Sequence, residues 1–554
     1  MSGTAASPTP SASPAPPSPR LWLGLIAVSL GVALIVVDIT IVNVILAPII
    51  EDLSIGSAEA QWIQESYAIV FAALVLLTGR LSDLHGARKI FLIGLAVFGA
   101  TSLLAAVAPN GGLLILARFL QGIGGAMILP TSLALVNASF TGRARAQAFA
   151  VWGSTIGAAA AVGPLIGGWL ADFHWRWAFG INIPLVALIV AGALLFLPAS
   201  PRTRGRVDTA GAVLSAIGLG LLAFALIEGR NHGWFATTKP LTAGGFSWSG
   251  GPSPVLVALI VSVLALYAFW RRQAALGRRD EEPLMDVRLF SIGSFRNGNL
   301  VTLVVGLGEF GIVAVLPLWL QFALDYSALQ AGLALVALAV GSFCASGGSF
   351  SMAATVSPLA QVRLGLFLEA AGLALLGLIA AADSAWWLIA LALFVYGIGV
   401  GFATAQVTNI VLADVPAKSA GQGSGIQSAA RELGSALGIA LLTTLFFSTL
   451  AGSLTDRLAR AGLPEREAEQ LSGVVTESAG SVIPALAADP ATERAADAAR
   501  HAMTSGLELT SYVCAGLLLL ALAATLFVRP AAKTLTPAHE ERREDRDRLP
   551  DQAR

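Results

Sequence analysis

The sequence predicts an all-α membrane protein with about fourteen transmembrane helices. Of its 554 residues, 56% are hydrophobic and only 12% are charged, which is too apolar for a water-soluble chain. A helix needs about 20 residues to cross a bilayer, and helices are required because lipid offers no partner to backbone N–H and C=O groups. Apolar windows of suitable length lie at residues 21–47, 62–80, 90–108, 113–137, 146–170, 178–198, 209–228, 254–271, 298–322, 329–351, 362–382, 385–408, 426–449 and 508–528.

Basic residues predict the orientation of these helices. Arginine and lysine follow the second, fourth, sixth and eighth windows, whereas acidic residues follow the first. Because cytoplasmic loops are enriched in Lys and Arg, we expect a multi-pass protein of the cytoplasmic membrane with both termini inside the cell. We expect a disordered cytoplasmic tail at residues 1–20 and a charged one at 529–554. The 34 basic and 34 acidic residues balance, so no nucleic-acid partner is indicated.

The first window carries a carboxylate, Asp38, near its middle and Asn43 five residues later. An acid at the centre of a membrane helix costs roughly 3 kcal/mol, so it usually faces the bundle interior and finds a partner or a proton. Asp38 is therefore a candidate proton-coupling site. The alternative is a polar residue that joins helices or borders a wet cavity.

The fourth window carries Arg118, followed by Gln121. A guanidinium stays charged in a membrane helix and must meet a carboxylate, a polar substrate or water. We expect Asp38 to be its partner, with Gln121 and Asn43 in the same group of substrate or charge contacts.

A second intramembrane acid, Glu309, lies among three glycines in the ninth window. A carboxylate on such a cavity-lining helix could bind a second proton or a cationic compound. Glu369 and Glu432 lie nearer the inner ends of their windows, where solvated or ion-paired structural roles are expected.

Two glycine-rich motifs point to conformational change. The short connection between the second and third windows holds Gly79, Asp83, Gly86 and Arg88, and a charge cluster there could latch two parts of the bundle together. In the fifth window, small residues let a neighbouring helix approach closely, and a proline removes one backbone hydrogen bond and permits a bend. These positions are Gly153, Gly157, Gly163, Pro164, Gly167 and Gly168.

These motifs resemble the major facilitator superfamily. The Gly79–Lys89 loop and the Arg118-x-x-Gln-Gly sequence match its patterns, and Gly163-Pro-x-x-Gly-Gly168 is similar to the antiporter signature of drug exporters. Three further segments look like the fourteen-helix drug:proton antiporters, namely Asp38 to Pro48, Gln61 to Tyr67 and Trp175 to Pro184.

The resemblance implies a major facilitator fold, with two six-helix halves plus two additional central helices. The N-terminal half would span residues 21–200, the linker with the additional helices 201–285, and the C-terminal half 286–528 with an extracellular loop at 450–507. That loop would hold short amphipathic helices or be a plain spacer. The resemblance also implies proton coupling at Asp38, and it makes Glu65 and Tyr67 candidates for cation contact, although a solvated helix end explains Glu65 equally well.

The predicted function is proton-coupled efflux of amphipathic drugs, antibiotics or toxic metabolites by alternating access. Intramembrane acids outnumber the one intramembrane arginine counted, which favours a cationic cargo. We expect a monomer that needs no cofactor, because the proton gradient drives transport. One alternative is a uniporter or importer of a small metabolite. Another is a membrane-embedded enzyme, but all five histidines fall in connections or at window ends and no paired metal ligands occur in the windows.

Overall fold

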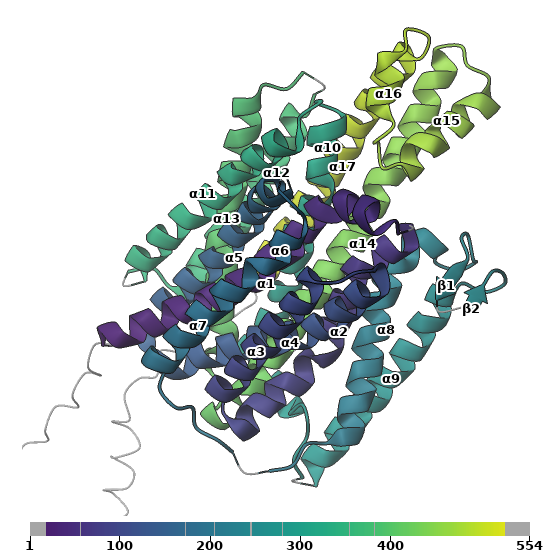
Figure 1. Cartoon of the computed structure of the whole chain (residues 1–554). Helices are drawn as coiled ribbons and strands as arrows, with labels where there is room; N and C mark the ends of the chain where they lie inside the picture. The colour runs from purple at the N-terminus through teal and green to yellow at the C-terminus, as the bar shows by residue number, and fades with distance from the viewer. Residues whose placement is uncertain are drawn as a thin grey trace, which may run out of the picture.

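The computed structural model describes residues 18–526, apart from 56, 172, 204, 244, 245, 280, 354 and 382. Most of the first expected tail and all of the second lie outside the described residues. The chain forms one bundle of long helices (Figure 1). Within the described residues, thirteen helices are long and apolar enough to cross a membrane, and α5, with 30 residues, packs among them. Each predicted window coincides with one of these helices, so the predicted all-α membrane fold is confirmed.

The first group of helices packs α1 against α5 and α7, and α4 against α2 and α3. Ser102, Arg118 and Asn182 face the inside of this group and are at most 1% exposed. The helices are α1 (Pro19–Leu53), α2 (Ser57–His85), α3 (Ala87–Ala106), α4 (Gly111–Ser139), α5 (Gly142–Ala171), α6 (Arg176–Gly180) and α7 (Asn182–Phe196).

The last group packs α10 against α14, α13 against α11 and α12, and α17 against α12 and α14. It meets the first group where α14 lies on α2 and α4, and where α11 and α13 lie on α5. Its elements are the short 3-10 helices η1 (Val287–Ser291) and η2 (Ala417–Ser419), with α10 (Gly293–Phe322), α11 (Ala328–Met352), α12 (Pro358–Ile379), α13 (Trp386–Ala413), α14 (Ala420–Arg460) and α17 (Glu493–Leu526).

An additional helix pair, α8 (Thr209–His232) and α9 (Pro254–Arg278), lies at the edge of the bundle against α2 (Figure 1). A small hairpin, β1 (Leu241–Ala243) with β2 (Phe246–Trp248), joins the two helices at one end. At the other end Asp208 caps α8 by accepting a hydrogen bond from Gly211 N at 3.0 Å, and it also binds Arg272 and Gln273 of α9. One carboxylate therefore starts α8 and fastens it to α9.

Residues 450–507 are helical throughout most of their length, in line with the expectation of short helices in this segment. Helix α14 continues to Arg460 because Leu450, Leu454 and Leu458 are spaced on one face and are buried. They pack beside α15 (Glu465–Glu477), while α16 (Ile483–Ala488) packs on the start of α17. In Figure 1 these helices project beyond the end of the bundle.

Candidate functional site

The predicted pair of Asp38 and Arg118 is formed. Arg118 Nη1 lies 2.5 Å from Asp38 Oδ2, and both side chains are only 1% exposed. Asp38 comes from the middle of α1 and Arg118 from α4, so the ion pair ties two helices together inside the bundle. A buried carboxylate and guanidinium are tolerated only when both are paired and hydrogen-bonded.

Uncharged polar side chains complete the shell around Asp38. Gln121 Nε2 and Asn182 Nδ2 each donate to Asp38 Oδ1 at 2.9 Å. Both amides also donate to the Ser102 hydroxyl, at 2.9 and 3.2 Å. Gln121 was predicted for this site, whereas Ser102 on α3 and Asn182 on α7 were not. The carboxylate thus accepts hydrogen bonds from three side chains on two other helices.

Arg118 is held by more than its ion pair. Its Nε donates to the Ile63 carbonyl at 3.1 Å, and its Nη1 donates to Gln121 Oε1 at 2.7 Å. The Tyr67 ring lies under the guanidinium, 4.6 Å from ring centroid to Cζ, which is a cation–π contact. The predicted Tyr67 is therefore part of this site.

A central cavity of about 170 Å³ lies beside this cluster, between the first and last helix groups. Its walls are mostly apolar, with Tyr67, Arg118, Arg431 and Glu432 among the polar residues that line it. Asp38 is not among the described lining residues, whereas Arg118, which binds it, is. Arg118 therefore connects the candidate proton site with the cavity.

The predicted contact residue Glu65 is not among the described residues that line the cavity. Glu65 is only 7% exposed, so it is not the solvated helix end that the sequence allowed. The side chain of Asn43 lies outside the described residues.

In the last helix group, Glu309 pairs with Arg431. Arg431 Nη2 lies 2.9 Å from Glu309 Oε2, and the two side chains are 9% and 8% exposed. The count of a single intramembrane arginine was wrong, because Arg431 on α14 is a second one. The excess of acid that favoured a cationic cargo is correspondingly smaller.

Glu369 was also misjudged. It is 0% exposed, and neither carboxylate oxygen has a hydrogen-bond partner among the described residues. Helix α12 begins at Pro358, capped by Ser357, four residues before the predicted window. Glu369 therefore lies near the middle of the helix, and the expected solvated or ion-paired role is wrong.

The Gly79–Lys89 loop joins the two helix groups. Asp83 accepts hydrogen bonds from Gly421 N at 2.6 Å and Gln422 N at 2.9 Å, both at the start of α14. A carboxylate is favourable there because the N-terminal amides of a helix are unpaired and carry partial positive charge. A Cβ on Gly79 would lie 2.6 Å from the Gly421 carbonyl, so this contact requires glycine.

The partner of Asp83 differs from the prediction. Arg88 does not bind it, and instead donates from Nη2 to the Leu194 carbonyl at 2.7 Å and from its backbone N to the Ser200 hydroxyl at 3.0 Å. Asp83 therefore binds backbone amides where a cluster of charged side chains was expected. Gly86 has φ of +90°, which explains why glycine is needed at that turn.

The glycines of α5 face helices of both groups. Gly153 packs on Ala405 of α13 and Gly157 on Ser342 of α11, whereas Gly163 and Gly167 pack on Thr40 and Ile41 of α1. Gly168 faces open space. The side chain of Pro164 lies outside the described residues. Four of the five predicted glycines thus lie at close helix contacts.

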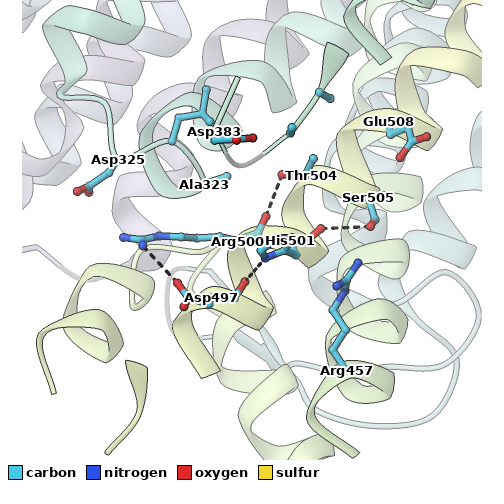
Figure 2. Close-up of a pocket in the computed structure, with 13 residues that line it drawn as sticks. Ala323, Asp325, Asp383, Arg457, Asp497, Arg500, His501, Thr504, Ser505 and Glu508 are labelled. Carbon is cyan, nitrogen blue, oxygen red and sulfur yellow. Dashed lines mark hydrogen bonds and ion pairs between the residues drawn. The ribbon is translucent and has the colours of Figure 1, made fainter. Parts of the chain in front are cut away.

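A larger pocket, of about 640 Å³, lies away from the central cavity (Figure 2). It is formed by the ends of α10, α12, α14 and α17, on the face predicted to be extracellular. Its lining includes Asp325, Asp383, Arg457, Arg500, His501 and Glu508. This pocket was not predicted from the sequence.

Comparisons with known proteins give the family. The Major Facilitator Superfamily model matches residues 28–249 and 223–439. A puromycin resistance protein of Streptomyces alboniger is 35% identical over 79% of this chain and 84% of its own. The probable actinorhodin transporter of Streptomyces coelicolor is 32% identical over 82% of this chain and 76% of its own. The multidrug efflux pump LfrA of Mycolicibacterium smegmatis is 31% identical over 91% of this chain and 95% of its own.

Solved structures agree on the fold. The chain is similar to the proton:xylose symporter XylE, with a TM-score of 0.59 at 12% identity over 92% of this chain and 96% of that one. It is also similar to the human organic anion transporter MFSD10, with a TM-score of 0.55 at 15% identity over 92% and 100%. The chain therefore belongs to the major facilitator superfamily, and within it to the drug and antibiotic efflux transporters, which are not enzymes.

Proposed function

We propose that the protein exports small amphipathic compounds across the cytoplasmic membrane in exchange for protons, with Asp38 as the coupling acid. The proton gradient drives this cycle, so no cofactor is required, and a single chain carries the whole route. Both termini lie in the cytoplasm in this arrangement.

The observation that carries the proposal is that Arg118 belongs both to the ion pair and to the cavity wall. It binds the buried Asp38 carboxylate and at the same time lines the central cavity. Hydrogen bonds to an ionised group contribute roughly 1.5–3 kcal/mol. Protonation of Asp38 removes the charge that holds the guanidinium, so uptake of a proton releases Arg118 and changes the cavity wall.

The cavity suits an amphipathic cargo. Apolar side chains from α1, α2, α5 and α14 form most of its surface, and Tyr67 adds an aromatic face. Glu432 is the acidic residue among the described cavity-lining residues, and it supplies a contact for a cation. A lipophilic cation satisfies both features, because its charge finds Glu432 while its apolar part stays out of water.

Alternating access is supported by the contacts between the helix groups. Asp83 binds the start of α14, and Arg145 Nε donates to Asn409 Oδ1 at 3.1 Å on the same face. These bonds close the face predicted to be cytoplasmic. In the proposed cycle cargo enters when they break, and proton uptake from outside accompanies release when they have formed again.

The test is Asp38→Asn in everted vesicles with an imposed pH gradient. We expect cargo uptake to fall by at least about tenfold, the effect of losing one 1.4 kcal/mol interaction, with the protein still inserted. Asp52→Asn is the matched control, since Asp52 lies on the same helix but is exposed and binds Arg176. Normal pumping by Asp38→Asn contradicts the coupling role. Wild-type uptake that only equilibrates, unaffected by the gradient, indicates a uniporter.

A further inference from the structure

Glu369 is a buried carboxyl group that has no ion-pair partner and no hydrogen bond among the described residues. Helix α12 packs it against α13 and α17, and a Cβ on Gly399 of α13 would lie 2.8 Å from Glu369 Cγ. Moving an ionised carboxylate into such surroundings costs several kcal/mol unless it is paired. In this conformation the group is therefore neutral and holds a proton.

Within the described part of the chain, the positive group near Glu369 is Arg431, which forms no ion pair with it. Arg431 of α14 is already bound to Glu309 of α10 at 2.9 Å. The other neighbours are Tyr396 of α13 and Cys514 of α17. The Tyr396 hydroxyl donates to the Gly308 carbonyl at 3.4 Å, and Cys514 Sγ lies 3.9 Å from the same oxygen. The cluster of Glu309, Arg431 and protonated Glu369 is electrically neutral.

A stripe of polar side chains on α17 leads from this cluster towards the outside. Thr504, Glu508, Ser511 and Cys514 are spaced three or four residues apart, so they share one helix face. Ser511 and the adjacent Thr510 are 0% exposed, and their hydroxyls have no hydrogen-bond partner among the described residues. Buried hydroxyls are costly unless water reaches them. Water molecules bound at these two positions would satisfy the hydroxyls.

The stripe ends in the pocket of Figure 2, where Thr504 and Glu508 appear on one helix. Glu508 is exposed there, together with Asp325 and Asp383, and His501 lies one turn before Ser505. Carboxylates and an imidazole can collect protons from solvent at neutral pH. The rise from Glu508 to Cys514 is about 9 Å along the helix axis, a distance that a few water molecules can bridge.

We propose that Glu369 is a second proton-exchanging group, loaded from outside through the pocket of Figure 2 and the polar stripe of α17. The proton passes from Glu508 along water at Ser511 and Thr510 to the Glu369 carboxylate, which becomes a carboxylic acid. Release of this proton leaves the cluster of Glu309, Arg431 and Glu369 with one negative charge, which a cationic cargo can neutralise. The inference rests on the proposed exchange of protons for cargo.

The first test measures protonation directly. Infrared spectra of the purified, lipid-reconstituted protein should contain a C=O stretching band of a protonated carboxylic acid that Glu369→Gln removes. Glu477→Gln is the matched control, because Glu477 is exposed on α15. If the band is the same in wild type and Glu369→Gln, then Glu369 is not a proton carrier and the inference is wrong.

The second test measures coupling in proteoliposomes, with ethidium as a fluorescent lipophilic cation and an internal pH dye. We expect Glu369→Gln to halve the number of protons moved per ethidium ion. Thr510→Val with Ser511→Ala should keep this ratio but shift the external pH of the half-maximal rate to a lower value. Thr443→Val with Ser448→Ala is the matched control, because those hydroxyls of α14 bind their own helix.

The outcomes separate the two proposals. Ethidium movement without protons in the wild type refutes proton-coupled export, while the infrared band of Glu369 is unaffected by that result. An unchanged ratio in Glu369→Gln, with a proton-coupled wild type, refutes only the second proton site. A pH profile that the Thr510 and Ser511 substitutions leave unchanged refutes the α17 path.

Discussion

At the scale of single residues, the shape of the Arg118 side chain matters as much as its charge. The guanidinium donates to Asp38, Gln121 and the Ile63 carbonyl in three directions and lies over the Tyr67 ring. A lysine ammonium carries the same charge but cannot reproduce this planar arrangement. The position therefore selects arginine specifically.

Arg118→Lys tests this geometry. We expect the variant to insert normally but to transport at least about tenfold more slowly, because one or two hydrogen bonds of roughly 1.5 kcal/mol each are lost. Initial uptake rates in everted vesicles, normalised to protein amount, measure the effect. Arg460→Lys, at an exposed position of α14, should transport as the wild type does. Equal rates for Arg118→Lys would mean that charge alone suffices.

Charged residues of the site were easier to predict than uncharged ones. Asp38 and Arg118 stood out because a charge inside an apolar window is costly and needs a partner. Ser102 and Asn182 carry no such signal, since small polar residues are common in membrane helices. Glu369 was missed for a different reason: the apolar window began after the true helix start at Ser357 and Pro358, which placed the acid too near the end.

At the scale of helices, Asp208 fastens the additional pair. Burial raises its pKa, but the bonds from Arg272, Gly211 and Gln273 outweigh this effect, and the net pKa is lowered from 3.8. Because the pKa of Asp208 is lower in the folded state than in the unfolded chain, its carboxylate stabilises the folded state at pH values above the unfolded pKa. This stabilisation is lost as the pH falls through the folded pKa.

Asp208→Asn should therefore destabilise the α8–α9 pair in a pH-dependent manner. We expect a loss of about 1 kcal/mol at neutral pH, because Arg272 is partly exposed and its ion pair is screened. The measurement is thermal unfolding of the purified wild type and variant, once at pH 7 and once at a pH below the pKa of Asp208. The difference from wild type should shrink in acid. Asp286→Asn, whose partner Arg288 is more exposed, serves as the control.

Helix positions followed from the sequence because the apolar length needed to cross a bilayer is fixed. The ends of the helices could not be predicted in this way, because amphipathic turns continue beyond the lipid. Helix α14 shows this, with Leu454 and Leu458 buried against α15 after the predicted window has ended. The partner of Asp83 was equally hidden, because the sequence does not show that the backbone amides of α14 lie beside it.

At the scale of the whole molecule, the contact of Asp83 with α14 joins the first and last helix groups on one face. Each charged hydrogen bond contributes roughly 1.5–3 kcal/mol, and this free energy exists only while the two helix groups touch. The additional pair α8–α9 supplies no residue to the central cavity among the described lining residues. The first and last helix groups meet through α2, α4, α5, α11, α13 and α14, and α8 also contacts α14.

Asp83→Asn should shift the transporter towards the conformation open on the predicted cytoplasmic face. Losing one such bond changes the population ratio by about tenfold or more. Spin labels at the exposed positions His85 and Lys418, one on each helix group, report the change as a longer distance. Asp456→Asn, on the exposed surface of α14, should leave the distance distribution unchanged. An unaltered distribution in Asp83→Asn would show that other contacts hold the face closed.

The pairing of the buried Asp38 with Arg118 has an energetic consequence for the cell. If hydrogen ions could hop freely onto and off the acid from both compartments, the pump would short-circuit the membrane and waste respiratory work whenever no toxin was present. While the ion pair with Arg118 is intact, Asp38 is only 1% exposed and already occupied, which opposes such idle leakage between transport cycles. Under the proposed coupling, the pump can therefore stay in a resting membrane at little metabolic expense.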